Sequence, residues 1–253
     1  MSTLLLLVLL AAQPEKMEWK VGDVTRDALV FPPSKKGDAA PPLVFAFHGH
    51  GGTSQNASKT FKFQDEWPEA VVVYMQGLPT PGKTDPDGKK PGWQKTVGDQ
   101  EDRDLKFFDA VLATMKEKYK IDEKRLYVTG HSNGGGFTYL LFAARPDLFA
   151  AIAPSAAGVG GLKGLKDVKP IPVMHIAGEK DDVVPFEAQK KTMDGVKEYN
   201  GCEAEGKEWA KGCTIYASSK DAPLVSFIHG GTHKYPAEAP ALIVKFFKEH
   251  ARK

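Results

Sequence analysis

The chain has 253 residues, with 34 lysines and arginines against 32 aspartates and glutamates, which gives a formal net charge of +2. It is 42% hydrophobic and contains 25 glycines and 18 prolines, a composition that suits a globular domain with many turns and excludes a disordered chain. Because the lysines are scattered among acidic residues and form no basic block, we predict no nucleic-acid partner.

The N-terminal segment carries an apolar run from Leu4 to Ala12. The run is too short to span a bilayer but has the length of a signal-peptide core. We therefore predict a signal peptide over residues 1–13, one catalytic domain over 14–253, and a secreted or periplasmic protein without stable membrane association after processing. Two features oppose export: no lysine or arginine precedes the run, and Gln13 disrupts the expected cleavage pattern. A misassigned start codon and a short membrane anchor are the alternatives.

From residue 43 onward, strand and helix patterns alternate along the chain. The expected strands are 43–47, 71–75, 126–129, 150–153, 172–176 and 224–228, and the expected helices are 102–119, 134–144, 186–199 and 237–250. The stretch 79–95 is rich in proline, glycine and lysine and is predicted to be a long surface loop. This alternation predicts the α/β class, with a mostly parallel central sheet and helices on both faces.

A glycine-rich loop, His48-Gly49-His50-Gly51-Gly52, follows the first of these strands. Glycines let a backbone approach a substrate closely, and acyl transfer needs two backbone N–H groups that stabilise a developing oxyanion. We predict that His50 supplies one of them and Asn133 the other, while the ring of His48 holds the loop. The alternative is a flexible turn with two surface histidines.

The segment Gly130-His131-Ser132-Asn133-Gly134 lies between an expected strand and an expected helix. This is the G-x-S-x-G pattern, and it lies between a strand and a helix, the context in which the pattern marks a nucleophilic serine. It predicts Ser132 as a nucleophile on a strained turn. The alternatives are an ordinary turn and a phosphate-binding loop, but the latter lacks its closing Lys-Ser/Thr pair.

A serine nucleophile needs a histidine base, and that histidine needs a carboxylate to orient it; in this arrangement they follow the serine in the order acid, then base. The loop after the strand at 172–176 offers Asp181 as the acid, with Glu179 and Asp182 as competitors. The loop after the strand at 224–228 offers His233 as the base, with His229 as its competitor.

Two histidines elsewhere are expected to have packing roles. His131 flanks the nucleophile and is predicted to point away from it, and His175 lies within an expected strand.

The two cysteines, Cys202 and Cys213, fall in a polar stretch between an expected helix and an expected strand. In an exported protein such a pair is predicted to form a disulfide, whereas in a cytoplasmic protein both would be free thiols. Two ligands without a nearby histidine do not make a structural zinc site, so no metal is predicted.

Four motifs taken together resemble those of polyhydroxybutyrate depolymerase-like and feruloyl esterase-like secreted esterases. They are His48-Gly49 with its following glycines, Gly130-His131-Ser132-Asn133-Gly134-Gly135, Gly178-x-x-Asp181-x-x-Val184-Pro185, and Gly231-x-His233-x-x-Pro236. The resemblance extends from about residue 24 to 250. It implies an α/β-hydrolase fold and a cofactor-free esterase whose triad is Ser132, Asp181 and His233.

The resemblance also points to two aromatic residues as substrate contacts. Trp93 lies in a Pro-Gly-Trp-Gln segment and resembles a substrate-side aromatic of this family, although a loop residue folded onto the surface is the alternative. Many relatives carry tryptophan two residues after the catalytic histidine, where this chain has Tyr235. That departure weakens the inference about substrate preference but not about mechanism.

These residues predict two-step acyl transfer on an ester substrate, either a small molecule or a polymer. The expected substrates are feruloyl or acetyl esters of plant polysaccharide, or a short hydroxyalkanoate polyester. A peptidase or thioesterase would use the same residues, and a non-catalytic binding module on a hydrolase scaffold is the alternative from another class.

Overall fold

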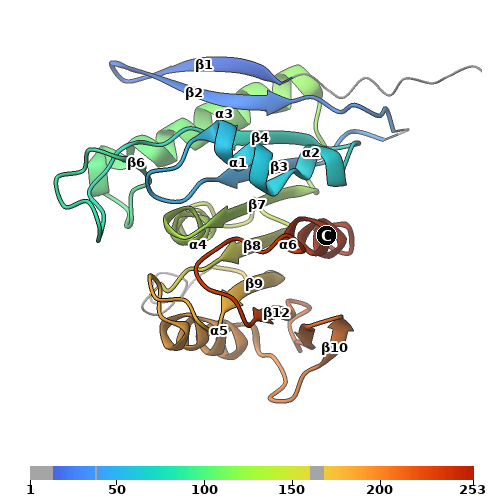
Figure 1. The fold of residues 1–253 in the computed structure, drawn as a ribbon. Coiled ribbons are helices and arrows are strands. Elements are labelled where there is room, and N and C mark those ends of the chain that lie inside the picture. Colours follow the sequence, from blue (N-terminus) through green and yellow to red (C-terminus); the bar gives the residue numbers. More distant parts are fainter. Residues whose placement is uncertain (1–13, 38, 160–167) are drawn as a thin grey trace, which may run out of the picture.

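A computed structural model describes residues 14–37, 39–159 and 168–253. A single 10-stranded sheet crosses the molecule in the order β1-β2-β4-β3-β7-β8-β9-β12-β11-β10. Figure 1 shows the β1–β2 pair at one end of this sheet, β10 at the other, and helices on both sides. The predicted signal peptide, residues 1–13, lies outside the described residues.

The strands of the main sheet are β1 (Glu15–Val21), β2 (Val24–Phe31), β3 (Leu43–Phe47), β4 (Val71–Met75), β7 (Leu126–His131), β8 (Ala151–Ser155), β9 (Val173–Gly178), β10 (Lys207–Ala210), β11 (Cys213–Tyr216) and β12 (Leu224–His229). A separate two-stranded ribbon consists of β5 (Leu78–Pro79) and β6 (Pro91–Gly92). The helices are α1 (Ser54–Phe61), α2 (Phe63–Glu66), α3 (Arg103–Tyr119), α4 (Asn133–Ala144), α5 (Phe186–Asn200) and α6 (Ala239–Lys248), with a 3₁₀ turn at Asp99–Asp102.

The centre of the sheet is parallel, as predicted, and runs through β4, β3, β7, β8, β9 and β12. The continuous apolar runs identified these strands because both faces of a parallel sheet are buried. The antiparallel strands at the two edges were missed. The β1–β2 hairpin does carry a signal: its apolar residues alternate, and Gly22-Asp23 is a two-residue turn between Val21 and Val24.

Alternate side chains of each central strand enter two different cores. Leu43, Phe45 and Phe47 of β3 face the core beneath α3, α4 and α5. Val44 and Ala46 of the same strand face the core beneath α1, α2 and α6. The sheet is therefore covered on both faces, and its polar loops are confined to its ends.

The predicted disulfide is wrong: Cys202 and Cys213 are free thiols in the structure. Cys202 follows α5 and packs against the α3–α5 core, whereas Cys213 on β11 is buried in the core on the other face of the sheet. The sheet lies between the two cores, so proximity in sequence does not bring the sulfur atoms together. Burial raises the pKa of both thiols.

Within the described residues, no helix combines the length and apolar character needed to cross a membrane. The same part of the chain contains no group of three or more histidine, cysteine, aspartate or glutamate side chains arranged to hold a metal ion.

Candidate active site

The turn between β7 and α4 holds Ser132 in an unusual backbone conformation, with φ 57° and ψ −120°. Non-glycine residues rarely adopt a positive φ, and such strain is concentrated at functional sites. The glycines on either side make the turn sterically feasible. A Cβ on Gly130 would lie 2.4 Å from the Gly134 carbonyl oxygen, and one on Gly134 would lie 2.3 Å from the Phe47 carbonyl oxygen.

Ser132, His233 and Asp181 form a continuous line of hydrogen bonds. The Ser132 Oγ lies 2.9 Å from His233 Nε2, and His233 Nδ1 lies 2.8 Å from Asp181 Oδ2. The three residues follow β7, β12 and β9, whose parallel alignment brings their carboxyl ends to one edge of the sheet. With its Nδ1–H donated to the carboxylate, His233 presents Nε2 as an acceptor to the serine hydroxyl.

Asp181 is held as a carboxylate in a buried position. Burial alone would raise its pKa, but the hydrogen bonds from His233 and from the backbone N–H groups of Val184 and Val183 outweigh that effect and lower the pKa. Both backbone groups donate to Oδ1, at 2.8 and 3.0 Å. The competing residues Glu179 and Asp182 are exposed, and neither is hydrogen-bonded to His233.

Three buried polar residues lie behind Asp181; the sequence analysis named His175 among them, as a packing residue, but neither Gln189 nor Tyr139. Gln189 Nε2 donates to Asp181 Oδ2 at 3.0 Å and to the Val184 carbonyl at 2.7 Å. His175 is the next of the three, and its Nδ1 lies 2.8 Å from the Tyr139 hydroxyl. Burial lowers the pKa of His175 to about 4, so its ring is neutral, in keeping with the predicted core position.

The two residues predicted to supply oxyanion donors line the same cavity as Ser132. Asn133 begins α4, so its backbone N–H has no partner within the helix. Among the described residues, no acceptor is found for this N–H or for that of His50. The neighbouring amides are already used: Gly51 N–H donates to the Pro91 carbonyl, and Ser132 N–H to the Ser155 carbonyl.

The side chains of His48 and His50 fix the predicted oxyanion loop, residues 48–52, through contacts outside the cavity. His48 is buried; its Nε2 accepts the Gly77 N–H at 3.0 Å and its Nδ1 lies 2.7 Å from the Gly49 carbonyl oxygen, so its ring holds the loop as predicted. Burial lowers its pKa to about 4. The His50 ring lies 3.3 Å from Asp85 Oδ2, which also accepts the Lys90 N–H. The long loop 79–95 is thereby tied to the oxyanion loop.

The predicted substrate contact by Trp93 is wrong. Its side chain is fully buried, stacks on Phe137 at 5.3 Å between ring centroids, and donates from Nε1 to the His48 carbonyl at 2.8 Å. The Asn133 side chain clamps the Trp93 backbone, accepting its N–H at 2.7 Å and donating to its carbonyl at 3.1 Å. Trp93 therefore anchors the loop against Asn133, the residue that follows Ser132.

Tyr235 also lies away from the cavity around Ser132. Its ring packs against Phe61, with centroids 4.5 Å apart, and meets the His131 ring edge-on at 5.6 Å. Burial raises the pKa of its hydroxyl, which has no hydrogen-bond partner among the described residues. The structure does not bring this predicted substrate contact to the site.

The two remaining histidines near the site have other partners. His131 Nδ1 lies 3.1 Å from the Ser155 hydroxyl, and burial followed by repulsion from His233 lowers its pKa to about 4. His229 accepts the Gly231 N–H at 3.2 Å.

A cavity of about 470 Å³ opens beside Ser132. Besides Ser132, Asn133 and His50, its walls include residues 81–84 and 94–95, Gly136 and Phe137 of α4, residues 157–159 after β8, and Val183 and Val184, which follow Asp181. Lys83 and Lys95 add charge to a largely apolar lining. Sequence reasoning did not assign these residues to the wall, because which side chains line a cavity depends on the paths of the loops; Val184 belongs to a quoted motif but was given no role of its own.

The chain is similar to curated feruloyl esterases. It is 30% identical over 162 residues to the probable feruloyl esterase C of Aspergillus clavatus, a match covering 64% of this chain and 56% of that protein. It is 28% identical over 232 residues to feruloyl esterase B of Piromyces equi, covering 80% of this chain and 41% of that protein. The matched region thus spans only about half the length of these relatives. The prolyl oligopeptidase family matches residues 92–163.

Solved structures share the fold over nearly the whole chain. A ferulic acid esterase superposes with a TM-score of 0.68 at 14% identity, covering 94% of this chain and 97% of that one. An acetyl xylan esterase from Aspergillus awamori gives a TM-score of 0.67 at 13% identity, with 93% and 99% coverage. The predicted α/β-hydrolase fold and the predicted resemblance to feruloyl esterases are both confirmed.

Proposed function

We propose that this chain, which has the α/β-hydrolase fold and is similar to feruloyl esterases, is a serine esterase that cleaves carboxylic esters through an acyl-enzyme. The observation that carries the proposal is the line from Ser132 through His233 to Asp181, with hydrogen bonds of 2.9 and 2.8 Å. Two backbone N–H groups without acceptors lie at the same cavity, where an oxyanion would need them.

In the first step, Ser132 Oγ attacks the ester carbonyl carbon as His233 Nε2 takes the hydroxyl proton. The carbonyl oxygen becomes an oxyanion and accepts hydrogen bonds from the backbone N–H groups of Asn133 and His50. Its collapse breaks the bond to the alcohol, which leaves with the proton from His233. Water then loses a proton to His233 and attacks the acyl-enzyme, releasing the acid and restoring Ser132, while Asp181 orients the imidazole throughout.

The proposed substrates are feruloyl or acetyl esters of plant polysaccharide. The names of the relatives support this class, and so does a cavity whose valine and phenylalanine walls suit an aromatic or short acyl group. A short hydroxyalkanoate polyester is the alternative within the same chemistry. Because such polymers lie outside cells, this proposal includes export of the chain, with residues 1–13 as the signal.

A peptidase is the second candidate, favoured by the match of residues 92–163 to the prolyl oligopeptidase family. The same residues would cleave an amide, since His233 can protonate a departing amine as well as an alcohol. The two functions differ in leaving group, so parallel ester and peptide substrates distinguish them.

The test combines active-site labelling with a substrate panel. We expect a fluorophosphonate probe to label the wild-type protein and the Asp182→Asn variant, but not Ser132→Ala. Asp182→Asn is a matched control because it removes an exposed carboxylate adjacent to the proposed acid. We further expect hydrolysis of methyl ferulate or p-nitrophenyl acetate at least a hundredfold faster than that of peptide p-nitroanilides or a polyhydroxybutyrate film. An unlabelled wild-type protein would overturn the proposal, and faster peptide cleavage would favour the peptidase.

A further inference from the structure

A second cavity, of about 720 Å³, lies at the opposite edge of the sheet from Ser132. Pro41 and Pro42 precede β3 and Arg125 precedes β7, so this cavity adjoins the amino ends of the parallel strands. Ser132 follows the carboxyl end of β7. We refer to it as the amino-edge cavity, and a ligand bound there leaves the candidate active site open.

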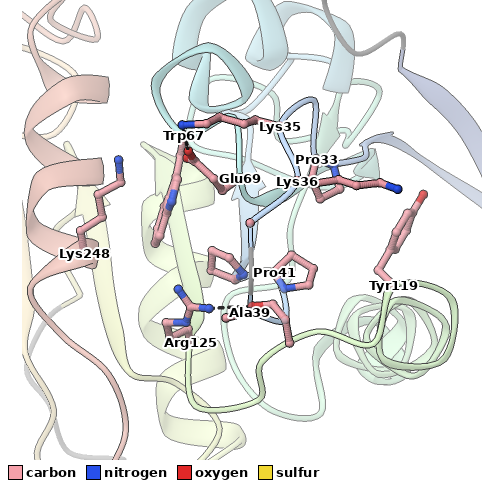
Figure 2. Close-up of a pocket in the computed structure, with 13 residues that line it drawn as sticks. Pro33, Lys35, Lys36, Ala39, Pro41, Trp67, Glu69, Tyr119, Arg125 and Lys248 are labelled. Atoms are coloured by element: carbon pink, nitrogen blue, oxygen red, sulfur yellow. Dashed lines mark hydrogen bonds and ion pairs between the residues drawn. The ribbon is translucent and has the colours of Figure 1, made fainter.

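The lining of the amino-edge cavity is strongly basic. Among the residues that the structure describes, it includes Lys35, Lys36, Arg125 and Lys248 and one carboxylate, that of Glu69. Glu69 pairs with Lys35 at 2.9 Å, and this hydrogen bond lowers the pKa of Glu69. In Figure 2, Lys248 and Lys36 lie on opposite sides of the central prolines.

Two of these cations are available to a ligand. Both Lys36 and Lys248 are exposed, and neither has an acidic partner within 4.0 Å among the described residues. Lys248 instead extends over the Trp67 ring, with its Nζ 5.4 Å from the ring centroid. Arg125 is already positioned by Asp122 and by the Ala40 carbonyl, which leaves part of its guanidinium edge for an anion.

We propose that the amino-edge cavity binds an acidic polysaccharide, with uronate carboxylates on Lys36, Lys248 and Arg125 and sugar rings against the prolines. This inference rests on the proposed function, because it supplies a second contact with the polymer whose esters are cleaved. Holding the polymer at a second site raises the effective concentration of ester groups near the enzyme without altering the cavity beside Ser132.

The apolar part of the lining favours sugars over nucleic acid. Pro33 and Pro41 are partly exposed and offer aliphatic rings of the size of a pyranose face. Binding of single-stranded nucleic acid relies on a series of exposed aromatic faces on which successive bases stack. Among the described lining residues, Trp67 is only 4% exposed, so Tyr119 is the one aromatic ring that is partly exposed. A polymer that alternates carboxylates with aliphatic rings therefore matches the distribution of charge around this cavity better than one that alternates phosphates with flat bases.

The experiment measures binding separately from catalysis, in a Ser132→Ala background. Affinity electrophoresis compares glucuronoxylan with neutral arabinoxylan and a single-stranded oligonucleotide, for the parent and for a Lys36→Ala/Lys248→Ala double variant. We expect the parent to bind glucuronoxylan at least fivefold more tightly than arabinoxylan, and the double variant to lose most of that difference. The preference should also weaken as salt rises from 20 to about 150 mM, since screening acts on exposed charges.

The matched control is Lys20→Ala/Lys207→Ala, which removes two exposed lysines outside the cavity. Equal retention of both xylans, equal losses in the two double variants, or tighter binding of the oligonucleotide would overturn the inference. Methyl ferulate hydrolysis by the same lysine variants with Ser132 intact reports on the proposed function independently. If the protein hydrolyses methyl ferulate but shows no preference for glucuronoxylan, only the proposal for the amino-edge cavity is contradicted. If it prefers glucuronoxylan but hydrolyses no ester, only the proposed esterase function is contradicted.

Discussion

At the scale of single residues, the orientation of the Asp181 carboxylate is set by other hydrogen bonds besides the one from His233. One oxygen receives two backbone N–H groups, and the other receives His233 and Gln189. The buried amide of Gln189 is the only one of these donors that belongs to a side chain without a proposed chemical role. We therefore regard Gln189 as a positioning residue that keeps Asp181 oriented toward His233.

Replacing Gln189 by leucine tests this role. A hydrogen bond to a charged group contributes about 1.5–3 kcal/mol, so its loss should slow the reaction of Ser132 with a fluorophosphonate by roughly tenfold or more. The control is Met193→Ala on the same helix, which removes buried volume without touching Asp181. We expect Met193→Ala to lower the melting temperature but leave the labelling rate within twofold. Similar rates for Gln189→Leu and wild type would show that Asp181 needs no such support.

At the scale of elements, the long loop 79–95 contacts the predicted oxyanion loop, residues 48–52, and forms one wall of the cavity beside Ser132. Three of its residues bind neighbouring segments. The Trp93 backbone binds the Asn133 side chain, and the Asp85 carboxylate lies beside the His50 ring. The Gln94 backbone N–H donates to the buried Asp104 at 2.8 Å. Asp104 also pairs with the buried Arg26 at 2.8 Å. Because Asp104 is buried and bound both to Arg26 and to the backbone of Gln94, it holds this part of the loop in place.

We expect Asn133→Ala to loosen this loop while preserving the backbone N–H of residue 133. The KM for methyl ferulate, which needs the cavity wall, should rise about fivefold or more, and that for p-nitrophenyl acetate should change little. Steady-state kinetics on both esters provide the measurement. Asp87→Asn, an exposed change in the same loop, serves as the control and should match wild type. Parallel rises in KM for both esters would point to damage at the nucleophile instead of the wall.

At the scale of the whole molecule, buried neutral histidines make stability depend on pH. Burial lowers the pKa of His48 and of His175 to about 4 in the folded chain, against about 6.5 for an unfolded one. As pH falls below 6.5 the unfolded state takes up these protons first. The free energy of unfolding should therefore decrease by about 1.4 kcal/mol per pH unit for each of these histidines, down to about pH 4, and His131, whose pKa is also lowered to about 4, adds to the effect.

Urea unfolding at pH 7, 6 and 5 measures this slope. The variant His175→Gln removes one titrating group, so we expect a shallower slope between pH 6 and 5 even if its stability at pH 7 is lower. The same slope in the variant and in the wild type would contradict the assignment to His175.

The sequence and the structure agree where a local signal coincides with a long-range constraint. Ser132, Asp181 and His233 could each be placed because every one follows an apolar run that forms a central strand. Trp93 and Tyr235 could not, because whether an aromatic ring lines a cavity or fills a core depends on the path of its loop. The role of Gln189 could not be predicted either. In the sequence it is one polar residue of an amphipathic helix, and only the packing of α5 beside β9 brings it to Asp181.

Cys202 and Cys213 lie in the cores on opposite faces of the sheet, and this separation bears on how the protein can be produced. Because both thiols are free in the structure, we expect the chain to fold without an oxidant or a disulfide isomerase. Production in the reducing cytoplasm of a bacterial host, with thiol reagents kept in every buffer, is compatible with the native architecture.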